Sequence, residues 1–267
     1  MTKKTPLKPA PSPVKGGLLA VPAVGGAIAK VPGATATNTE RDGDVVLVSD
    51  TTYVTSSITV PAEQVFFDKA AKPAAKGKWL GEADKVSWLD PASGYECIML
   101  RDTQQGYLCG YVGVPSTHPL HGFEHDAIPA ALGIEVHGGL EYSKICQAGP
   151  TPEKRRIAVE SRRICHVPRE YHYAETVHGS DHRVQDRHAW WFGFECNHAH
   201  DLVPGDRPGT TRTFRAETGT VYRDDAYVCR EILNLAAQLK AVADGAPMPE
   251  RDGPPLPPAA LDPRRGR

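Results

Sequence analysis

Short apolar runs separated by polar turns dominate the middle of the chain, and they predict β-strands. Residues 95–100 and 107–114 are two such runs, and the polar segment 102–106 between them is typical of the turn of an antiparallel hairpin. Residues 189–196 (AWWFGFEC) are apolar almost throughout, which indicates a strand buried on both faces. Residues 133–136 predict another strand, which runs into a glycine-rich turn.

A single amphipathic helix is predicted at residues 225–243. Asp224 or Asp225 can cap its first turn, and Gly245 can end it. A helix with one apolar face packs that face against a sheet. The chain is therefore predicted to fold as an α+β protein: an antiparallel sheet of about four to six strands with the C-terminal helix on one face. The apolar residues that recur at intervals of three and four, and so share this face, are Val228, Ile232, Leu235, Ala236 and Leu239.

Both ends of the chain are predicted to be disordered. Residues 1–43 form a basic arm rich in proline and glycine, and positions 1–39 hold five lysines, six prolines, five glycines and no acidic residue. Such a segment buries too little apolar surface to offset the entropy that ordering costs. The arm can be a solubilising segment, or it can bind a partner or an anionic surface. Residues 246–267 contain seven prolines and predict a disordered tail.

The folded part is predicted to follow the arm. Residues 44–78 predict a small β-hairpin appendage and a linker, because short β-branched runs there precede a segment of lysine, alanine, proline and glycine. Residues 79–245 form the main domain, with a His- and Arg-rich insertion at 146–188. Basic residues from Lys154 to Arg169 offer a surface for nucleic-acid phosphates, but the glutamates among them favour a solvated segment instead.

Composition narrows the functional classes. The net charge is -1 and the pI is near 6.8, so the chain as a whole is neither a nucleic-acid coat nor a polybasic membrane protein. No stretch reaches the roughly 18 to 20 apolar residues of a membrane span, so no membrane partner is expected. The six cysteines are scattered and include no C-x-x-C pair, which argues against a zinc ribbon or a thioredoxin-type motif. Several lie in apolar runs, which predicts buried, reduced thiols.

The candidate chemistry lies in clusters of histidine and acidic residues. None of the eleven histidines precedes residue 118, and the clusters occupy 118–126, 135–139 and 195–201. Imidazole and carboxylate ligands with a bound water make a hydrolytic metal site, so we predict a divalent ion, zinc or manganese, and no organic cofactor. The predicted ligands are His137, His198 and Asp201, with His118 and Cys196 as secondary ligands and Glu135 and Glu195 as candidate general bases.

Two other hypotheses fit the same residues. A structural polar network needs no metal, and the spacing matches no established zinc motif such as H-E-x-x-H. Cys196 could be a nucleophile with His198 or His137 as its base. Alternation with Phe192 and Phe194 instead points its side chain into the core, where thiols are inert.

Several segments occur in a recognisable order. They are GYVGVP (110–115) with His118-Pro119, VHGGL (136–140) with Tyr142-Ser143, WWFGFEC (190–196) with His198 and Asp201, and Tyr222-Arg223-Asp224 before the helix. Together they resemble an uncharacterised protein family common in bacteriophage and prophage genomes, over about residues 88 to 240. The polar positions of the family pattern correspond here to His118, His137, Cys196, His198 and Asp201.

The chain also departs from that pattern. Glu135 and Glu195 stand where the family usually has Asp, which keeps the charge but moves it by one methylene. Glu141 stands where a Thr is usual, and His200 is not part of the pattern. The segment 146–188 is much longer than the short connection typical of the family.

The resemblance implies a phage-encoded accessory protein that acts in the host cytoplasm, with virion association as a second location. Combined with the predicted metal site, it leads to a divalent-metal-dependent, hydrolase-like activity. The alternatives are a non-catalytic binder of a small ligand or a host protein, of the anti-defence type, and a virion-associated structural protein. An unknown small molecule or host protein is the expected partner, and the oligomeric state is left open.

Overall fold

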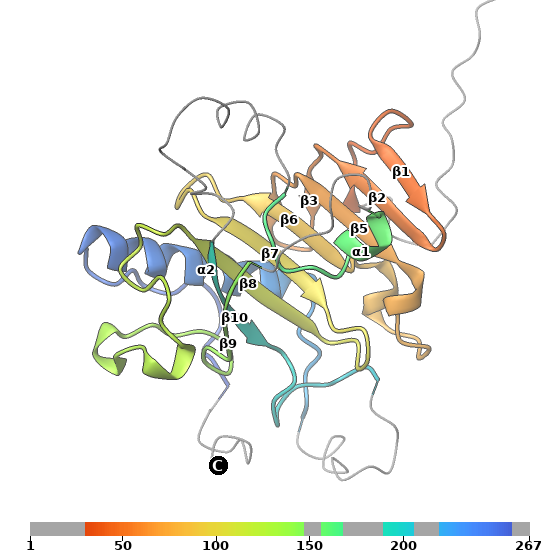
Figure 1. Ribbon diagram of the computed structural model, residues 1–267. Coiled ribbons are helices and arrows are strands. Elements are labelled where there is room, and N and C mark those ends of the chain that lie inside the picture. Colours follow the sequence, from red (N-terminus) through yellow and green to blue (C-terminus); the bar gives the residue numbers. More distant parts are fainter. Residues whose placement is uncertain (1–29, 147–155, 168–188, 206–218, 258–267) are drawn as a thin grey trace, which may run out of the picture.

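The computed structural model describes residues 30–146, 156–167, 189–205 and 219–257. Its centre is an eight-stranded antiparallel sheet, and helix α2 (Asp225–Asp244) lies across one face of that sheet (Figure 1). The predicted α+β class with a C-terminal helix on one face is confirmed, whereas the sheet is larger than the predicted size of about four to six strands.

The strands of the main sheet follow the chain except at one edge, where β10 lies between β8 and β9. A separate two-stranded sheet pairs β3 (Tyr53–Val54) with β4 (Thr59–Val60). In sheet order the main strands are β1 (Thr39–Asp42), β2 (Val45–Ser49), β5 (Gln64–Asp68), β6 (Lys85–Leu89), β7 (Glu96–Arg101), β8 (Leu108–Val114), β10 (Trp190–Glu195) and β9 (Tyr142–Ile145). The short helices are η2 (Lys69–Ala71), η3 (Lys78–Gly81), η4 (His125–Ala127), η5 (Ala130–Leu132) and α1 (Ile157–Glu160).

The apolar runs of the central sequence form the predicted central strands. β7 and β8 make the antiparallel hairpin, with Glu96 opposite Gly113, and Gly106 takes a positive φ of 76° in the turn. β10 pairs with β8 on one side and with β9 on the other. Its sequence is apolar on both faces because each face packs against a hydrophobic cluster. The predicted strand at 133–136 is not formed: this segment is irregular and lies against α2.

Residues 44–78 do not form a separate appendage. β2 and β5 pair with each other, and β5 pairs with β6, so this region continues the main sheet. The folded part also begins earlier than predicted, because β1 falls within the predicted arm and Val31 lies in the core with 2% exposure. Lys30 forms an ion pair with Asp225 at 2.5 Å. The rest of the predicted arm (1–29) and the end of the predicted tail (258–267) lie outside the described residues.

Helix α2 begins and ends as its sequence predicts. The Asp224 side chain accepts a hydrogen bond from the backbone N–H of Tyr227, and Gly245 takes the left-handed conformation that ends a helix. The predicted apolar face is wholly buried against β7 and β8. The contact is close because Gly110 of β8 has no side chain: an added Cβ would lie 2.6 Å from Cγ1 of Ile232.

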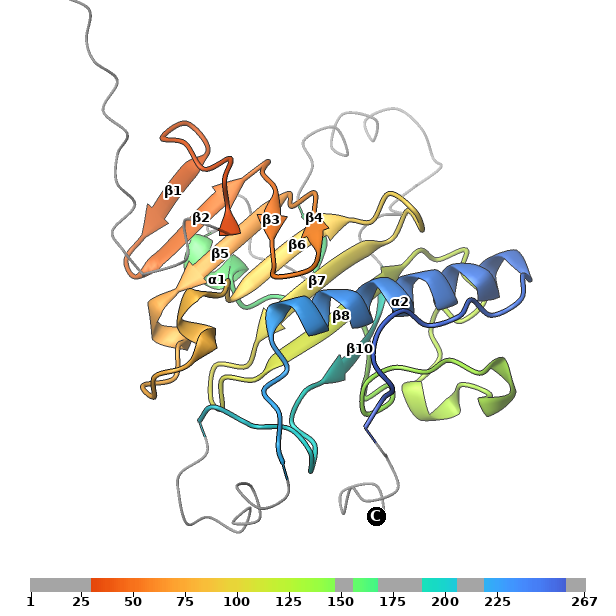
Figure 2. The same cartoon turned by 180° about the vertical axis from the view of Figure 1, so that it is seen from behind.

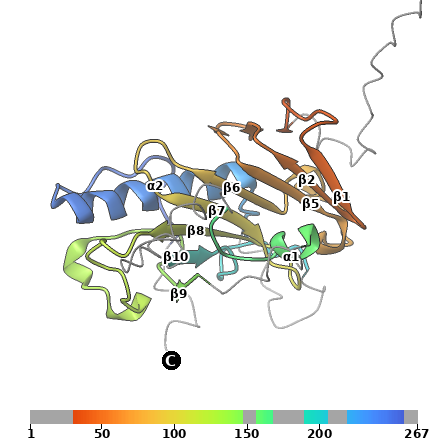
Figure 3. The same cartoon turned by 45° about the horizontal axis from the view of Figure 1, so that its top comes forward.

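The sheet is covered on both faces. Alternation along β10 directs Phe192 and Phe194 toward α2, and directs Trp191 toward a second apolar cluster on the opposite face. That opposite face is covered by α1 and the residues that follow it, whereas α2 lies on the other side (Figure 1, Figure 2). Figure 3 shows the long connection between β8 and β9 running beside α2. This connection carries the first two histidine clusters.

A buried arginine joins the turn after β7 to the start of α2. Arg101 is 2% exposed, and its guanidinium donates to Glu82 and Asp84, each at 2.8 Å, and to the hydroxyl of Tyr222 at 3.0 Å. The ammonium of Lys72 lies 2.8 Å from Asp84. Each buried charge therefore has a counter-charge, which is the condition under which buried ions are tolerated.

Candidate functional site

A cluster of polar side chains lies where three segments meet beside the first turn of α2. The segments are the turn at 136–141, the loop at 196–201 that follows β10, and residues 219–227, which lead into the helix. The last two segments are joined along their backbones: Val221 N–H donates to His200 C=O, and Leu202 N–H donates to Val221 C=O, each at 3.0 Å. This pairing places the start of α2 against the loop after β10.

Asp201 is the centre of the cluster. One carboxylate oxygen, Oδ2, accepts from the His137 ring at 2.8 Å and from the backbone N–H of His198 at 2.9 Å. The other, Oδ1, accepts from Arg223 Nε at 2.8 Å. Burial by itself raises the pKa of Asp201, but the hydrogen bonds from His137, Arg223 and the His198 backbone outweigh it and hold the pKa below the usual value. Asp201 is therefore an ionised, buried acceptor.

The ionised carboxylate fixes how the His137 ring is used. Nε2 must donate to Asp201, because a carboxylate only accepts. Nδ1 lies 2.8 Å from the Tyr227 hydroxyl. Burial raises the pKa of Tyr227, so the phenol keeps its proton, and its hydroxyl forms a hydrogen bond with Nδ1. Both ring nitrogens of His137 are thus engaged, and its side chain is only 1% exposed.

Arg223 completes the buried part of the site. Its guanidinium carbon lies 4.8 Å from the centre of the Tyr227 ring, which is within the range of a cation–π contact. Arg223, Asp201, His137 and Tyr227 therefore form a closed circuit of contacts. Such a circuit rigidifies the junction of three segments that are far apart in the sequence.

The solvent-facing side of the site is the pair formed by His198 and Glu141. Their side chains are 8% and 35% exposed, and Nε2 of His198 lies 3.4 Å from Oε2 of Glu141. The His198 ring lies beside the His137 ring, with centres 5.3 Å apart. Asp201 holds the backbone of His198, so the buried circuit positions this imidazole below the surface carboxylate.

A glycine lets the two loops come this close. Gly138 has a φ of 67°, in the region that favours glycine, and an added Cβ would lie 1.7 Å from Nε2 of His198. No side chain larger than hydrogen fits there without moving the imidazole. The glycine-rich turn of the sequence is therefore a site of close approach to His198.

The two predicted general bases do not join this cluster. The side chain of Glu135 is exposed, and only its backbone is fixed, by hydrogen bonds to Gln238 at 2.7 and 2.9 Å. Glu195 accepts from Tyr107 at 2.9 Å and from Asn197 at 2.8 Å. Because Phe194 faces α2 and His137, its neighbour Glu195 faces the opposite side of the sheet.

The two secondary ligand candidates have structural partners. His118 lies near the far end of α2, where Nε2 donates to the carbonyl of Leu239 at 2.9 Å and Nδ1 accepts from the N–H of Leu120 at 3.0 Å. Cys196 lies in the core with 2% exposure, and burial raises the pKa of its thiol, so it remains an unreactive thiol. The expectation that Cys196 points into the core is met.

The structure brings together the three predicted metal ligands, His137, His198 and Asp201. They form hydrogen bonds with one another or with neighbouring groups of the protein. Within the described ranges, no group of three or more His, Cys, Asp or Glu side chains is arranged to hold a metal ion. The metal site therefore stays a prediction. His137 fits it poorly, because binding a metal would require one of its two hydrogen bonds to break.

Three members of the cluster were absent from the predicted site: Arg223, Tyr227 and Glu141. Arg223 lies in a segment that carries the family resemblance, and Glu141 is a position where the chain departs from the family pattern. The roles of both side chains depend on contacts across the fold. Tyr227 lies at the start of a helix whose pattern signals only packing. No sequence spacing would have linked it to His137, 90 residues away.

The structure bears only in part on the predictions for nucleic-acid and membrane partners. Of the basic residues from Lys154 to Arg169, Arg162 and Arg163 pair with carboxylates, at 3.2 and 2.6 Å, while Lys154 and Arg169 lie outside the described residues. A nucleic-acid partner thus stays a prediction. In the described part of the chain, no helix has the length and apolar character needed to cross a membrane.

Comparison with protein-family models, with curated proteins and with solved structures finds no match to this chain.

Proposed function

We propose that the protein is a phage-encoded accessory protein of the host cytoplasm with a hydrolase-like site at His198 and Glu141. The pair would hold a divalent ion, zinc or manganese, which would supply an activated water for hydrolysis. The circuit of Asp201, His137 and Tyr227 would position His198 rather than bind the ion. This division of roles differs from the sequence prediction, which assigned His137 and Asp201 as ligands.

The distance between His198 Nε2 and Glu141 Oε2 carries the proposal. Two ligand atoms that each lie about 2.0–2.1 Å from a tetrahedral zinc ion are roughly 3.3–3.4 Å apart. The observed separation is 3.4 Å. The same separation is longer than a good hydrogen bond, so the two groups are close without being optimally bonded to each other.

The exposure of the pair also suits a site that meets a ligand. Exposure rises from His137 at the bottom, through His198, to Glu141 at the surface. An ion held by only two side chains leaves other positions for water and for substrate oxygens, as in magnesium sites with one or two protein carboxylates. Phosphoesters and amides are the substrates to screen, because both bonds are hydrolysed by metal-bound water.

Elemental analysis of protein purified without a His tag tests the proposal. We expect near-stoichiometric zinc or manganese in the wild type, and its loss in His198→Ala and in Glu141→Gln. His121→Ala is a matched control, because this imidazole packs beside Trp190, away from the cluster. Unchanged metal content in both site variants, or no metal in the wild type after reconstitution, would contradict the metal-dependent activity.

A non-catalytic binder is the second candidate. The observation that favours it is the arrangement of the described ligand residues, since His137 and Asp201 already satisfy each other and no group of three metal ligands is formed. His198 and Glu141 would then contact a small molecule or a host protein directly. A compound released from the purified protein on denaturation, retained by wild type but lost in Glu141→Gln, would support this function without metal.

Virion association is tested separately. Mass spectrometry of purified particles should detect the protein if it is a structural component. Its absence from particles would remove that alternative and leave the cytoplasmic functions.

A further inference from the structure

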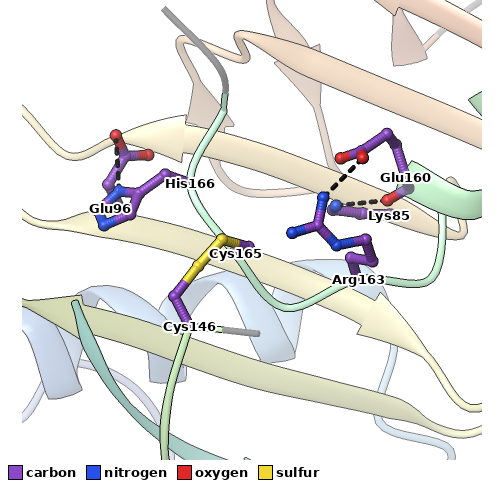
Figure 4. Close-up of a disulfide and its surroundings, with 7 residues drawn as sticks. All are labelled: Lys85, Glu96, Cys146, Glu160, Arg163, Cys165 and His166. Atoms are coloured by element: carbon purple, nitrogen blue, oxygen red, sulfur yellow. Dashed lines mark hydrogen bonds and ion pairs between the residues drawn. A yellow bond between two sulfur atoms is a disulfide. The ribbon is translucent and has the colours of Figure 1, made fainter. Parts of the chain in front are cut away.

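The sheet face opposite α2 is crossed by residues 156–167, which we call the strap. The strap begins with α1, whose Ile157 and Ala158 pack against Phe66 and its apolar neighbours on β2. It is fastened at its other end by a disulfide between Cys165 and Cys146, with the two Cα atoms 5.1 Å apart (Figure 4). This pair corrects the prediction of buried, reduced thiols for two of the six cysteines. The free thiols, all buried, are Cys97, Cys109, Cys196 and Cys229.

The strap covers polar side chains rather than a purely apolar surface. Lys85 and Ser87 alternate with Val86 and Trp88 along β6, so they face the strap while their neighbours face α2. Glu96 of β7 faces the same way. Lys85 is 2% exposed, Ser87 is 1% exposed and Glu96 is 5% exposed. Three polar side chains in a row are costly to bury, so the strap must provide polar partners.

The strap provides partners for two of them, Lys85 and Glu96. Nζ of Lys85 donates to the backbone carbonyl of Glu160 at 2.6 Å, and the ring of Phe66 lies 5.2 Å from the same nitrogen. The carboxylate of Glu160 is turned to Arg163, at 2.6 Å. His166 lies 3.5 Å from Glu96. Figure 4 shows the contacts of Glu160 with Lys85 and Arg163 on one side of the disulfide, and the contact of His166 with Glu96 on the other.

The environment of Lys85 makes its amine unusual. Burial lowers the pKa of Lys85 to about 7, although the nearby carboxylate of Glu160 opposes the shift. This lowered pKa belongs to the covered amine, because exposure to water removes the burial that causes it. Once exposed, Nζ reacts through the uncharged fraction that an ordinary lysine has at alkaline pH. In the disulfide-bonded structure the strap prevents a reagent from reaching it.

We propose that Lys85 is a concealed amine-modification site and that the Cys146–Cys165 disulfide controls access to it. Reduction would release the strap from β9 and expose Nζ to acyl donors. The site lies on the face of the sheet opposite α2, whereas His137 and Tyr227 contact each other on the helix side, so this inference does not depend on the proposed function.

The chemistry requires a thiol reductant and an acyl donor. Cys165 is partly exposed and Cys146 is buried, so an external thiolate attacks the Cys165 sulfur and Cys146 leaves as the thiolate, which takes up a proton. A second thiol resolves the mixed disulfide, so two external thiols are oxidised to one disulfide and both cysteines are reduced. Nζ of Lys85 then attacks an activated ester carbonyl, the alcohol component leaves, and one amine proton is lost.

Acetylation by an N-hydroxysuccinimide ester, followed by peptide mass spectrometry, tests the proposal on the full chain. We expect Lys85 to be unmodified in the oxidised protein and at least tenfold more modified after treatment with dithiothreitol or in Cys165→Ala. Lys76 is exposed and should react equally in every sample. Lys72 is a control for global unfolding, because it is buried in the Arg101 network and does not contact the strap.

Each labelling outcome either supports or contradicts the control of Lys85 by the disulfide. Selective labelling of Lys85 after reduction, with Lys72 still protected, supports the proposal. Equal labelling of Lys85 before and after reduction, continued protection once both thiols are titrated as free, or simultaneous labelling of Lys72 would each overturn it. Six free thiols in protein purified without reductant and then denatured would also overturn it, because the disulfide would not exist.

Discussion

The imidazole of His137 and the carboxylate of Asp201 are separated by 64 residues in the sequence and by 2.8 Å in the folded protein, and each side chain is 1% exposed. This single contact joins the turn at the end of the long β8–β9 connection to the loop after β10. Because Arg223 binds the second oxygen of the same carboxylate, the contact also fixes the start of α2. The surface pair His198 and Glu141 is built on this base.

Replacing Asp201 by Asn should destabilise the protein by about 1.5–3 kcal/mol, the usual range for hydrogen bonds to a charged group. The amide NH₂ would face a donor, either His137 or Arg223, in place of one accepting oxygen. Urea unfolding at pH 7 measures the effect. Asp244→Asn is the matched control: its carboxylate pairs with Lys240 but is 50% exposed, so the change should stay within about 0.5 kcal/mol. Equal effects of the two substitutions would contradict a central role for Asp201.

Gly138→Ala should destabilise the protein and displace the His198 ring. The backbone conformation alone costs about 1–3 kcal/mol for a residue with a side chain. The added Cβ would also lie 1.7 Å from Nε2 of His198. Gly133→Ala separates the two effects, because Gly133 has a φ of 69° but nothing within 4 Å of an added Cβ. The free energies of unfolding should therefore differ, and the NMR signals of His198 should move only in Gly138→Ala.

The central strands that the sequence predicts are those with two largely apolar faces. Both faces of the sheet are covered at β7, β8 and β10, so their sequences are apolar except at Glu96, Arg101 and Glu195. β6 is equally buried but was not predicted, because Lys85 and Ser87 occupy the face under the strap. β9 is an edge strand with a mixed sequence, and such strands carry little periodic signal.

Of the residues in the candidate site, the sequence predicted only His137, His198 and Asp201. Those residues stand out because polar clusters follow apolar strands. Alternation could have placed Glu195 correctly, since Phe194 and Cys196 already point to the core and the residue between them must point away. The partnership with Tyr227 and Arg223 depends on how α2 meets the sheet. The disulfide likewise follows from the three-dimensional position of the strap, because six cysteines allow many pairings.

Acidification should lower the free energy of unfolding because His118 takes up a proton more readily in the unfolded chain. The Leu239 carbonyl and the Leu120 N–H require Nε2 to carry the proton and Nδ1 to be bare, and burial lowers the pKa of the ring. A depressed folded pKa means that the unfolded chain binds the proton more readily. The stabilisation is therefore complete above the unfolded value of about 6.5 and is lost as the pH falls through the lower folded pKa.

The variant His118→Gln tests this dependence. Its amide can donate to Leu239 and accept from Leu120 but does not titrate, so the decrease in stability between pH 7.5 and pH 5 should become shallower. His121→Gln should change the slope less than His118→Gln does, because the charge of His121 lowers the pKa of His118 less than burial does. If both variants retain the wild-type slope in urea titrations, other groups are responsible for the acid sensitivity.

Lys85→Met should stabilise the protein at pH 7, and the gain should shrink as the pH rises toward 10. Burial lowers the pKa of Lys85 to about 7, against about 10.4 for an ordinary lysine, so between these values the unfolded chain holds a proton that the folded protein releases. Stability due to this group therefore rises with pH across the window, and it is lowest near pH 7, where folding must remove a proton or bury a charge. Methionine has a similar length and no charge, and it forfeits the hydrogen bond to Glu160 and the contact of the ammonium with the Phe66 ring. Urea unfolding of the disulfide-bonded variant and wild type at pH 7, 8.5 and 10 measures the difference, with the exposed Lys240→Met as control. A variant less stable than the wild type by the same amount at every pH would show that Lys85 contributes through the hydrogen bond and that its charge is well solvated.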